Sequence, residues 1–171
     1  MEKISFRKDV LPLKDMLFRL ALRITLNRAE AEDIVQDTMI KVWNKRDTWN
    51  QIESIEAFCT TICRNLSLDR AALKENLNQS IDTEGDFDRA DNAEGPYERA
   101  IQHDRMEIVR SLIDSLPEKQ RSCMQLRDIE GKAYKDIAAA LGITEEQVKV
   151  NIFRARQAVK QKFKEYDEYG L

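Results

Sequence analysis

Apolar residues recur at intervals of three and four along most of the chain, the spacing typical of amphipathic helices. The first such stretch covers residues 10–26. The second starts after Asn27, a capping residue with Glu30 at the third helical position, and runs to about residue 44. A third long helix starts at Ser54, and its predicted buried stripe is Ile55, Phe58, Cys59, Ile62, Leu66, Leu73 and Leu77. Because only five glycines and three prolines interrupt 171 residues, the sequence predicts an all-α fold.

The second half of the chain carries the signals of a helix-turn-helix. A helix ends near Ser115, and Ser115 with Glu118 predicts a capping box that opens the next helix. A short helix over 134–141 then leads to Gly142, which permits a left-handed turn, and Thr144 caps a longer helix. We therefore expect a four-helix domain containing a helix-turn-helix.

The charge of the chain divides it into three parts. The formal net charge is only −3, but residues 78–97 carry six acidic and one basic side chain, whereas the flanking segments, 1–77 and 98–171, are each near neutral. The central stretch is also rich in Asn, Ser, Gly and Asp and lacks a helical apolar period. We expect two small helical domains, 1–77 and 98–171, joined by an acidic linker at 78–97.

The last predicted helix is basic on one face. Six lysines and arginines fall between Thr144 and Lys164, against two acids at its start, Glu145 and Glu146. A basic helix after a glycine turn is typical of a reader of the DNA major groove, although an ordinary hairpin with a solvated face gives a similar pattern. The candidate DNA contacts are Lys149, Val150, Asn151, Phe153, Arg154, Arg156 and Lys160.

Two features of the first domain have two interpretations each. Ile40 stands among Asp33, Gln36, Asp37 and Lys41 on a face predicted to be exposed, which is either a solvated surface with one stray apolar residue or a partner-binding surface. Trp49 lies in a loop where no core period requires an aromatic residue. Trp43 and Trp49 are therefore packing residues, or they offer an aromatic platform to an unpaired base. For Trp43 we expect a mixed role, partly buried and partly at an interface, whereas for Trp49 both interpretations stay open.

The composition removes several function classes. One histidine, His103, makes a histidine-rich metal site or a hidden catalytic triad improbable, and five scattered glycines form no phosphate-binding loop. Three cysteines without metal-ligand spacing fit a reducing cytoplasm, and Cys59 and Cys63 are interpreted as buried apolar residues. No segment is apolar over the 18 to 20 or so residues of a membrane helix. We expect no catalytic residues, cofactor, metal or membrane insertion.

Two sets of motifs resemble the conserved domains of bacterial RNA polymerase sigma factors. The first set is Leu-Phe-Arg-Leu-Ala-Leu-Arg at 17–23, Ala-Glu-Ala-Glu-Asp-Ile-Val-Gln-Asp-Thr at 29–38, Lys-Val-Trp at 41–43 and Arg-Asn-Leu-Ser-Leu-Asp-Arg at 64–70. The second set includes Leu-Pro-Glu-Lys-Gln-Arg at 116–121, Tyr-Lys-Asp-Ile-Ala at 134–138 and Leu-Gly-Ile at 141–143. Because only these two domains are present, the layout is similar to that of the extracytoplasmic-function (ECF) group.

The resemblance implies a non-enzymatic function: an alternative sigma factor that binds core polymerase, reads the −35 and −10 promoter elements and promotes opening. It implies that the second domain reads the −35 element and touches the flap of the polymerase β subunit. In the first domain, it implies that the β′ clamp helices bind the face formed by Asp33, Gln36, Asp37, Ile40 and Trp43. It also implies that the −10 element is contacted by Trp49, Arg64, Asn65, Arg70 and Lys74.

The same resemblance implies a cytoplasmic protein whose linker threads toward the polymerase active site. It further implies an inhibitory anti-sigma partner, in many members anchored to the membrane. Members often carry Ser-Arg where this chain has Val150 and Asn151, which leaves its −35 preference open.

Two other functions fit parts of the sequence. One is a dimeric helix-turn-helix regulator that binds operator DNA tightly on its own. The other is a metal-dependent hydrolase with Glu30, Glu32, Asp33 and Asp37 as ligands.

Overall fold

The computed structural model describes residues 3–80 and 101–168. Within these ranges every regular element is a helix, which confirms the predicted all-α class. The first domain contains three α-helices, α1 (Lys14–Thr25), α2 (Arg28–Asn44) and α3 (Ile55–Ser80). Shorter turns precede and connect them: a π-turn η1 (Phe6–Val10) and the 3₁₀ turns η2 (Leu11–Leu13) and η3 (Arg46–Gln51).

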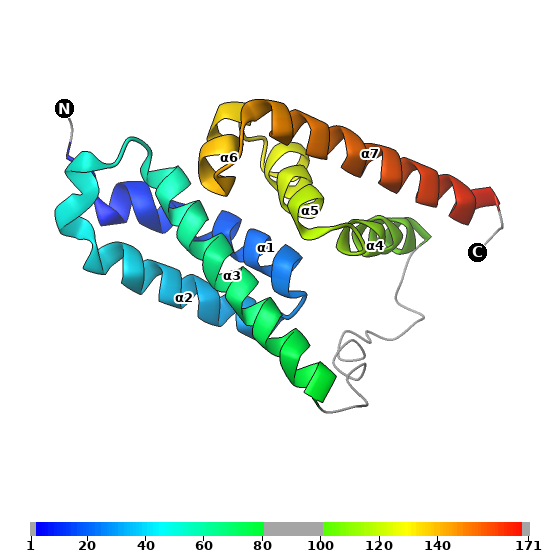
Figure 1. Cartoon of the computed structure of the whole chain (residues 1–171), viewed down its shortest axis with the longest axis horizontal. Coiled ribbons are helices and arrows are strands. Elements are labelled where there is room, and N and C mark those ends of the chain that lie inside the picture. The colour runs from blue at the N-terminus through cyan, green and yellow to red at the C-terminus, as the bar shows by residue number, and fades with distance from the viewer. Residues whose placement is uncertain (1–2, 81–100, 169–171) are drawn as a thin grey trace.

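The second domain contains the expected four α-helices. They are α4 (Ile101–Asp114), α5 (Glu118–Met124), α6 (Tyr134–Leu141) and α7 (Glu145–Glu168), with a π-turn η6 (Gln125–Ile129) after α5. Figure 1 shows α5, α6 and α7 stacked beside the first domain, and α2 on the far side of that domain.

Helix α2 follows its sequence signals closely. Asn27 Oδ1 accepts a hydrogen bond from the Glu30 amide at 2.9 Å, so the predicted N-cap is present. Its predicted core stripe is buried throughout: Ala31, Ile34, Val35, Thr38 and Val42. This stripe packs against α1 and α3, where Leu17 and Leu20 are fully buried.

Two positions of the predicted α3 stripe are exposed. Leu73 and Leu77 face solvent, although their spacing continues the period of the buried residues before them. The reason is length, because α3 has 26 residues whereas α1 has 12 and α2 has 17. The last turns of α3 therefore extend beyond the helices that could cover them, as Figure 1 shows.

The helix-turn-helix of the second domain forms as predicted. Gly142 has a φ of 68°, a left-handed conformation that glycine adopts without steric cost, and its amide donates to the Ala138 carbonyl at 2.9 Å. Thr144 and Gln147 form a reciprocal capping box, with backbone-to-side-chain bonds of 2.9 and 3.1 Å. The start and direction of α7 are thus fixed locally.

The capping box predicted at Ser115 and Glu118 is wrong. The Ser115 hydroxyl donates back to the Leu112 carbonyl at 2.6 Å, and Pro117 occupies the cap position without a side-chain bond. The Glu118 carboxylate instead accepts hydrogen bonds from Ser122 and from Arg64 of the first domain. Glu118 therefore forms a long-range ion pair with Arg64 instead of a local helix cap.

The two domains pack against each other through a continuous apolar core. Residues from α1 and α3 join Leu126, Ile137 and Leu141 of the second domain in one buried cluster. Helix α3 includes residues 78–80 of the predicted linker, and the rest of the linker, 81–97, lies outside the described residues.

All three cysteines are free thiols buried in this structure. Burial raises the pKa of Cys59 and of Cys63 to about 12 and that of Cys123 to about 11. The thiols are therefore protonated at neutral pH, as expected of packing residues.

We predict that Thr144→Ala lowers the free energy of unfolding by about 1 kcal/mol, because it leaves the Gln147 amide without its cap. Ser115→Ala is the matched control. Its hydroxyl caps no helix start, so we expect a loss of about 0.5 kcal/mol or less. Urea denaturation followed by circular dichroism measures both, and equal losses would contradict the assignment of the cap.

Candidate nucleic-acid interface

The outer face of α7 presents an exposed mixture of basic and apolar side chains. Lys149, Val150 and Arg154 are exposed, and Phe153 is 63% exposed. The buried face of the same helix, formed by Val148, Ile152 and Ala155, anchors it to α5 and α6. Residues expected to reach DNA therefore stand on a rigid helix with their side chains outward.

Two basic residues of this face, Arg156 and Lys149, already contact other side chains of the same chain. Arg156 makes a bidentate pair with Asp128 of η6, at 3.0 and 2.5 Å, and the hydrogen bonds to this carboxylate raise the pKa of the guanidinium. Lys149 stands 3.9 Å from Glu146 and over the ring of Tyr134. The side-chain amide of Asn151 donates to the Gln147 carbonyl at 2.7 Å, and Lys160 is exposed.

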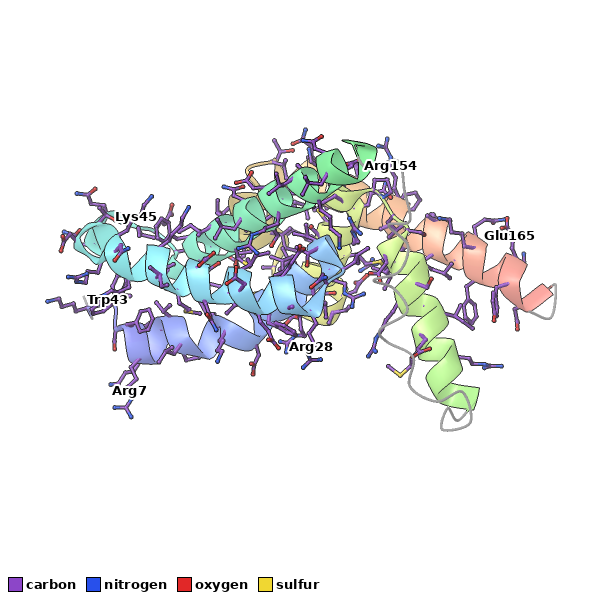
Figure 2. The ribbon with its side chains drawn as sticks, turned by 90° about the horizontal axis from the view of Figure 1, so that it is seen from below. Arg7, Arg28, Trp43, Lys45, Arg154 and Glu165 are labelled. Carbon is purple, nitrogen blue, oxygen red and sulfur yellow. The ribbon has the colours of Figure 1, made fainter. Side chains whose placement is uncertain are left out.

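The acidic face of α2 is open to solvent, as expected. Asp33 and Gln36 are exposed, Ile40 is 57% exposed and Trp43 is 45% exposed. The second domain packs on α1 and α3, which leaves this face uncovered. In Figure 2, Trp43 points outward at the end of the molecule opposite Glu165. An apolar centre with a polar rim is the composition of a protein-binding surface.

Arg70 of α3 lies across this acidic face. Its Nη2 donates to Asp33, and the same atom is 3.4 Å from Asp37. The hydrogen bond to Asp33 and the two negative charges raise the pKa of the guanidinium. The structure therefore joins a residue expected to contact DNA to two residues expected to contact the polymerase.

Of the two interpretations left open for Trp49, the structure supports packing. The ring is 7% exposed, its Nε1 donates to the Val42 carbonyl at 3.1 Å, and it stacks on Phe6 at a centroid distance of 6.4 Å. Trp43 meets both rings edge-on, so it is partly buried and partly exposed, as expected. In this conformation Trp49 is a packing residue and offers no platform to a base.

Arg64 is also buried, at 9% exposure. Its Nε and Nη2 donate to the two carboxylate oxygens of Glu118 at 3.1 and 3.0 Å, across the boundary between the domains. The expected contact between Arg64 and DNA is therefore blocked in this arrangement, whereas its neighbour Asn65 is exposed. Lys74 is half-buried on the same helix.

Further polar contacts cross the same boundary. Arg19 pairs with Glu130 at 2.6 and 2.7 Å, and Arg23 pairs with Asp114 at 2.7 Å. The Thr61 hydroxyl lies 2.9 Å from the Ala140 carbonyl. In all three arginine pairs the first domain supplies the cation and the second supplies the acid.

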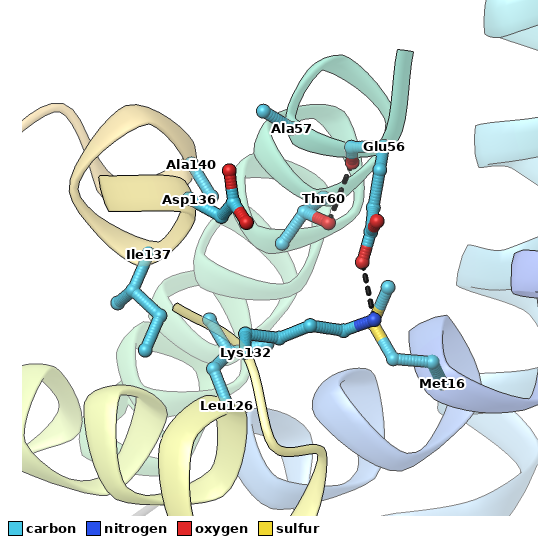
Figure 3. Close-up of a pocket in the computed structure, with 9 residues that line it drawn as sticks. All are labelled: Met16, Glu56, Ala57, Thr60, Leu126, Lys132, Asp136, Ile137 and Ala140. Carbon is cyan, nitrogen blue, oxygen red and sulfur yellow. Dashed lines mark hydrogen bonds and ion pairs between the residues drawn. The ribbon is translucent and has the colours of Figure 1, made fainter. Parts of the chain in front are cut away.

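One contact has the opposite polarity. Figure 3 shows Lys132, from the segment between η6 and α6, reaching Glu56 of α3 beside a small pocket lined by both domains. Thr60, from the wall of this pocket, uses its hydroxyl for the Glu56 carbonyl at 2.8 Å. Each domain therefore supplies cations and acids to the ion pairs that cross the boundary.

The acids in these pairs are the functional residues that the sequence analysis missed. Asp114, Asp128 and Glu130 resemble solvated surface acids in the sequence. Glu118 did carry a sequence signal, its place after Pro117 at a helix start, but this signal predicted a local cap that the structure does not contain. The remaining pairings depend on three-dimensional proximity.

The arrangement gives no support to the metal-ligand interpretation of α2. Asp33 and Asp37 are engaged by Arg70. Over the described ranges, no group of three or more histidine, cysteine, aspartate or glutamate side chains is placed to hold a metal ion. In the same ranges, no helix is both long and apolar enough to cross a lipid bilayer.

Comparison with known proteins gives two family matches. Residues 10–75 match the profile of sigma-70 region 2, and residues 106–159 match that of sigma-70 region 4. The chain is 30% identical over 148 residues to the ECF RNA polymerase sigma factor SigL of Mycobacterium tuberculosis, covering 85% of this chain and 81% of SigL. It is 34% identical over 148 residues to the ECF RNA polymerase sigma factor SigE of Mycolicibacterium smegmatis, and it spans 56% of that protein's length.

Solved structures share the fold. The sigma factor RpoE of Bartonella quintana, in complex with the anti-sigma factor NepR, has a TM-score of 0.72 and 24% identity over 93% of this chain and 96% of that one. CnrH, in complex with the cytosolic domain of CnrY, has a TM-score of 0.67 and 20% identity over 93% of this chain and 87% of CnrH.

We predict that Glu118→Arg separates the two domains, because it places a second cation against the part-buried Arg64. Small-angle X-ray scattering of the full chain should show a larger radius of gyration for this variant. Glu32→Arg is the control, since among the described residues the ion pair of Glu32 is with Arg28 of the same helix. An unchanged radius of gyration in Glu118→Arg would show that this pair does not hold the domains together.

Proposed function

Because the chain belongs to the ECF RNA polymerase sigma factors, transcription initiation factors that direct the polymerase to promoters, we propose how its surfaces divide that work. The observation that carries the proposal is the uncovered acidic face of α2, which remains open while the second domain covers α3. The polymerase binds this face first. The contact of Arg64 of α3 with DNA follows when the domains separate and its bond to Glu118 is broken.

The α2 face binds the β′ clamp helices. Asp33 and Asp37 pair with basic side chains there, Gln36 supplies hydrogen bonds, and Ile40 and Trp43 supply the apolar centre. Charged groups at the rim steer association, whereas the apolar centre provides affinity.

The outer face of α7 reads the −35 element in the major groove. Lys149, Val150, Asn151, Phe153 and Arg154 meet base edges or adjacent phosphates, and Phe153 is suited to apolar contact with a thymine methyl group. Arg156 and Lys160 lie further along the DNA backbone. The same domain touches the β flap.

The α3 helix contacts the opened −10 strand. Asn65 is exposed and supplies an amide that can hydrogen-bond a base edge. Arg64, Arg70 and Lys74 contact the strand backbone, Arg64 only after its bond to Glu118 is broken. Trp49 is left out of this set because its ring is buried.

Promoter binding depends on the polymerase because each of the two domains binds DNA only weakly on its own. A chain of net charge −3 gains little from phosphate neutralisation, the main source of non-specific DNA affinity. Fixing both domains on the polymerase raises their effective concentration at the promoter. Capture of unstacked bases then stabilises the open state by about 1–3 kcal/mol per base. The acidic segment 78–97 runs through basic channels of the polymerase until RNA displaces it.

Regulation by an anti-sigma factor is also part of the proposal. The support is that the sigma factors RpoE and CnrH, which share this fold, are described in complex with NepR and with the cytosolic domain of CnrY. Such a partner, soluble or anchored to the membrane, binds the chain in the cytoplasm, where it meets the polymerase.

The test of this function is fluorescence anisotropy of promoter-length duplex titrated with the protein, with and without bacterial core polymerase. We expect specific binding and start-site opening only when core polymerase is present. Tight duplex binding by the protein alone, indifferent to core, would instead establish an operator-binding regulator.

For the core-binding face, we predict that Asp37→Arg lowers affinity for core polymerase by about tenfold or more, because a reversed rim charge repels the basic partner. Glu165→Arg carries the same charge change on α7 of the second domain and should leave this affinity unchanged. Equal losses in the two variants would point to a non-specific effect of net charge.

A further inference from the structure

We propose that Arg70 is an internal substitute for the basic side chains of the polymerase. It holds Asp33 and Asp37 in the free protein and gives them up when the polymerase binds, which releases it toward the opened DNA strand. This inference rests on the proposed function of the α2 face.

The first support is geometric. Asp33 and Asp37 lie one helical turn apart on α2, and both direct a carboxylate at the same atom of Arg70, Nη2. Arg70 comes from α3, more than 30 residues later in the chain, so the contact is a tertiary one and not a consequence of helix spacing. An arginine of a partner would make the same hydrogen bonds from outside, and it would compete with Arg70 for the Oδ2 atom of each carboxylate.

The second support is accessibility. The side chains of Arg70, Asp33 and Asp37 are 32%, 52% and 44% exposed. A partner can therefore reach the carboxylates without unfolding the domain. An exposed ion pair contributes little net stability, so its exchange for another pair costs little.

The third support is the charge balance. One guanidinium faces two carboxylates, which leaves the cluster with an excess negative charge. The excess attracts a cationic partner even while Arg70 is bound. The Arg64–Glu118 pair differs on this point, since one cation there meets one acid and both side chains are largely buried.

The proposal has a consequence for DNA binding. Arg70 and Lys74 are four residues apart and therefore share a face of α3. Release of Arg70 adds a second cation to that face when the polymerase is engaged. Binding of core and binding of the opened strand then favour each other, and thermodynamic linkage requires the effect to be reciprocal.

The proposal is tested by whether substitution of Arg70 raises or lowers the affinity for core polymerase. We expect Arg70→Ala, and Arg70→Gln as a variant that keeps most of the side-chain stem, to bind purified core polymerase about two- to fivefold more tightly, because an internal competitor has been removed. Arg28→Ala is the matched control. It removes one exposed arginine from α2, next to Glu32 rather than Asp33, and should leave core affinity unchanged.

A double-mutant cycle locates the effect. If Arg70 acts through Asp33, the gain from Arg70→Ala shrinks in an Asp33→Asn chain. A second readout follows the released side chain: the holoenzyme carrying Arg70→Ala should bind a single-stranded −10 oligonucleotide more weakly than the holoenzyme carrying Arg28→Ala.

Each contrary result has a distinct meaning. Weaker core binding by Arg70→Ala and Arg70→Gln would show that Arg70 aligns the carboxylates rather than competing for them, and unchanged binding would show that it does neither. Either overturns this inference while leaving the proposed function intact. Failure of Asp37→Arg to weaken core binding would overturn the assignment of the α2 face itself.

Discussion

The pairing of arginines with carboxylates of the same chain is the interaction on which this arrangement depends. Three of the four arginines expected to meet DNA are held in this way: Arg64 by Glu118, Arg70 by Asp33 and Asp37, and Arg156 by Asp128. The pairs differ in how easily they are exchanged, because their side chains are buried to different extents. The Arg64 pair is enclosed between two domains, where removing one partner would strand a charge. The Arg70 and Arg156 pairs are open to solvent and exchange easily.

This difference explains why the domains pack as one unit although a separate sequence motif marks each of them. Apolar contacts between α1, α3 and the second domain provide the buried apolar surface between the domains, but such contacts have little directional preference. The ion pairs of Arg19, Arg23 and Arg64 supply the direction, since each must find its own acid. Charged pairs are also sensitive to competing charges. An interface built in this way can yield to a polyanion such as DNA, which an apolar interface alone would not do.

The sequence predicted well what is determined locally. The cap at Asn27, the buried stripe of α2, the turn at Gly142 and the capping box at Thr144 each depend on residues within one or two helical turns. The failures share a different cause. Glu118 binds Arg64 rather than forming its predicted cap, and Trp49 is buried against Phe6. In each case the partner lies far away in the chain. Leu73 and Leu77 keep the helical period of the buried residues before them and yet are exposed.

The candidate site follows the same rule. Exposure of the α2 and α7 faces could be read from helical periodicity, because each buried stripe defines its opposite face. Whether an arginine on such a face is available to DNA could not, because its availability depends on acids from other elements. The α2 face remains open while Arg64 of α3 is covered, so in the proposed function the chain meets the polymerase before it presents its full set of −10 contacts. A chain whose DNA-binding cations are neutralised internally has little affinity for the large excess of non-promoter DNA. In the proposed function, the Arg64–Glu118 pair, which also joins the domains, therefore helps to protect specificity, because it withholds one cation from DNA until the domains separate.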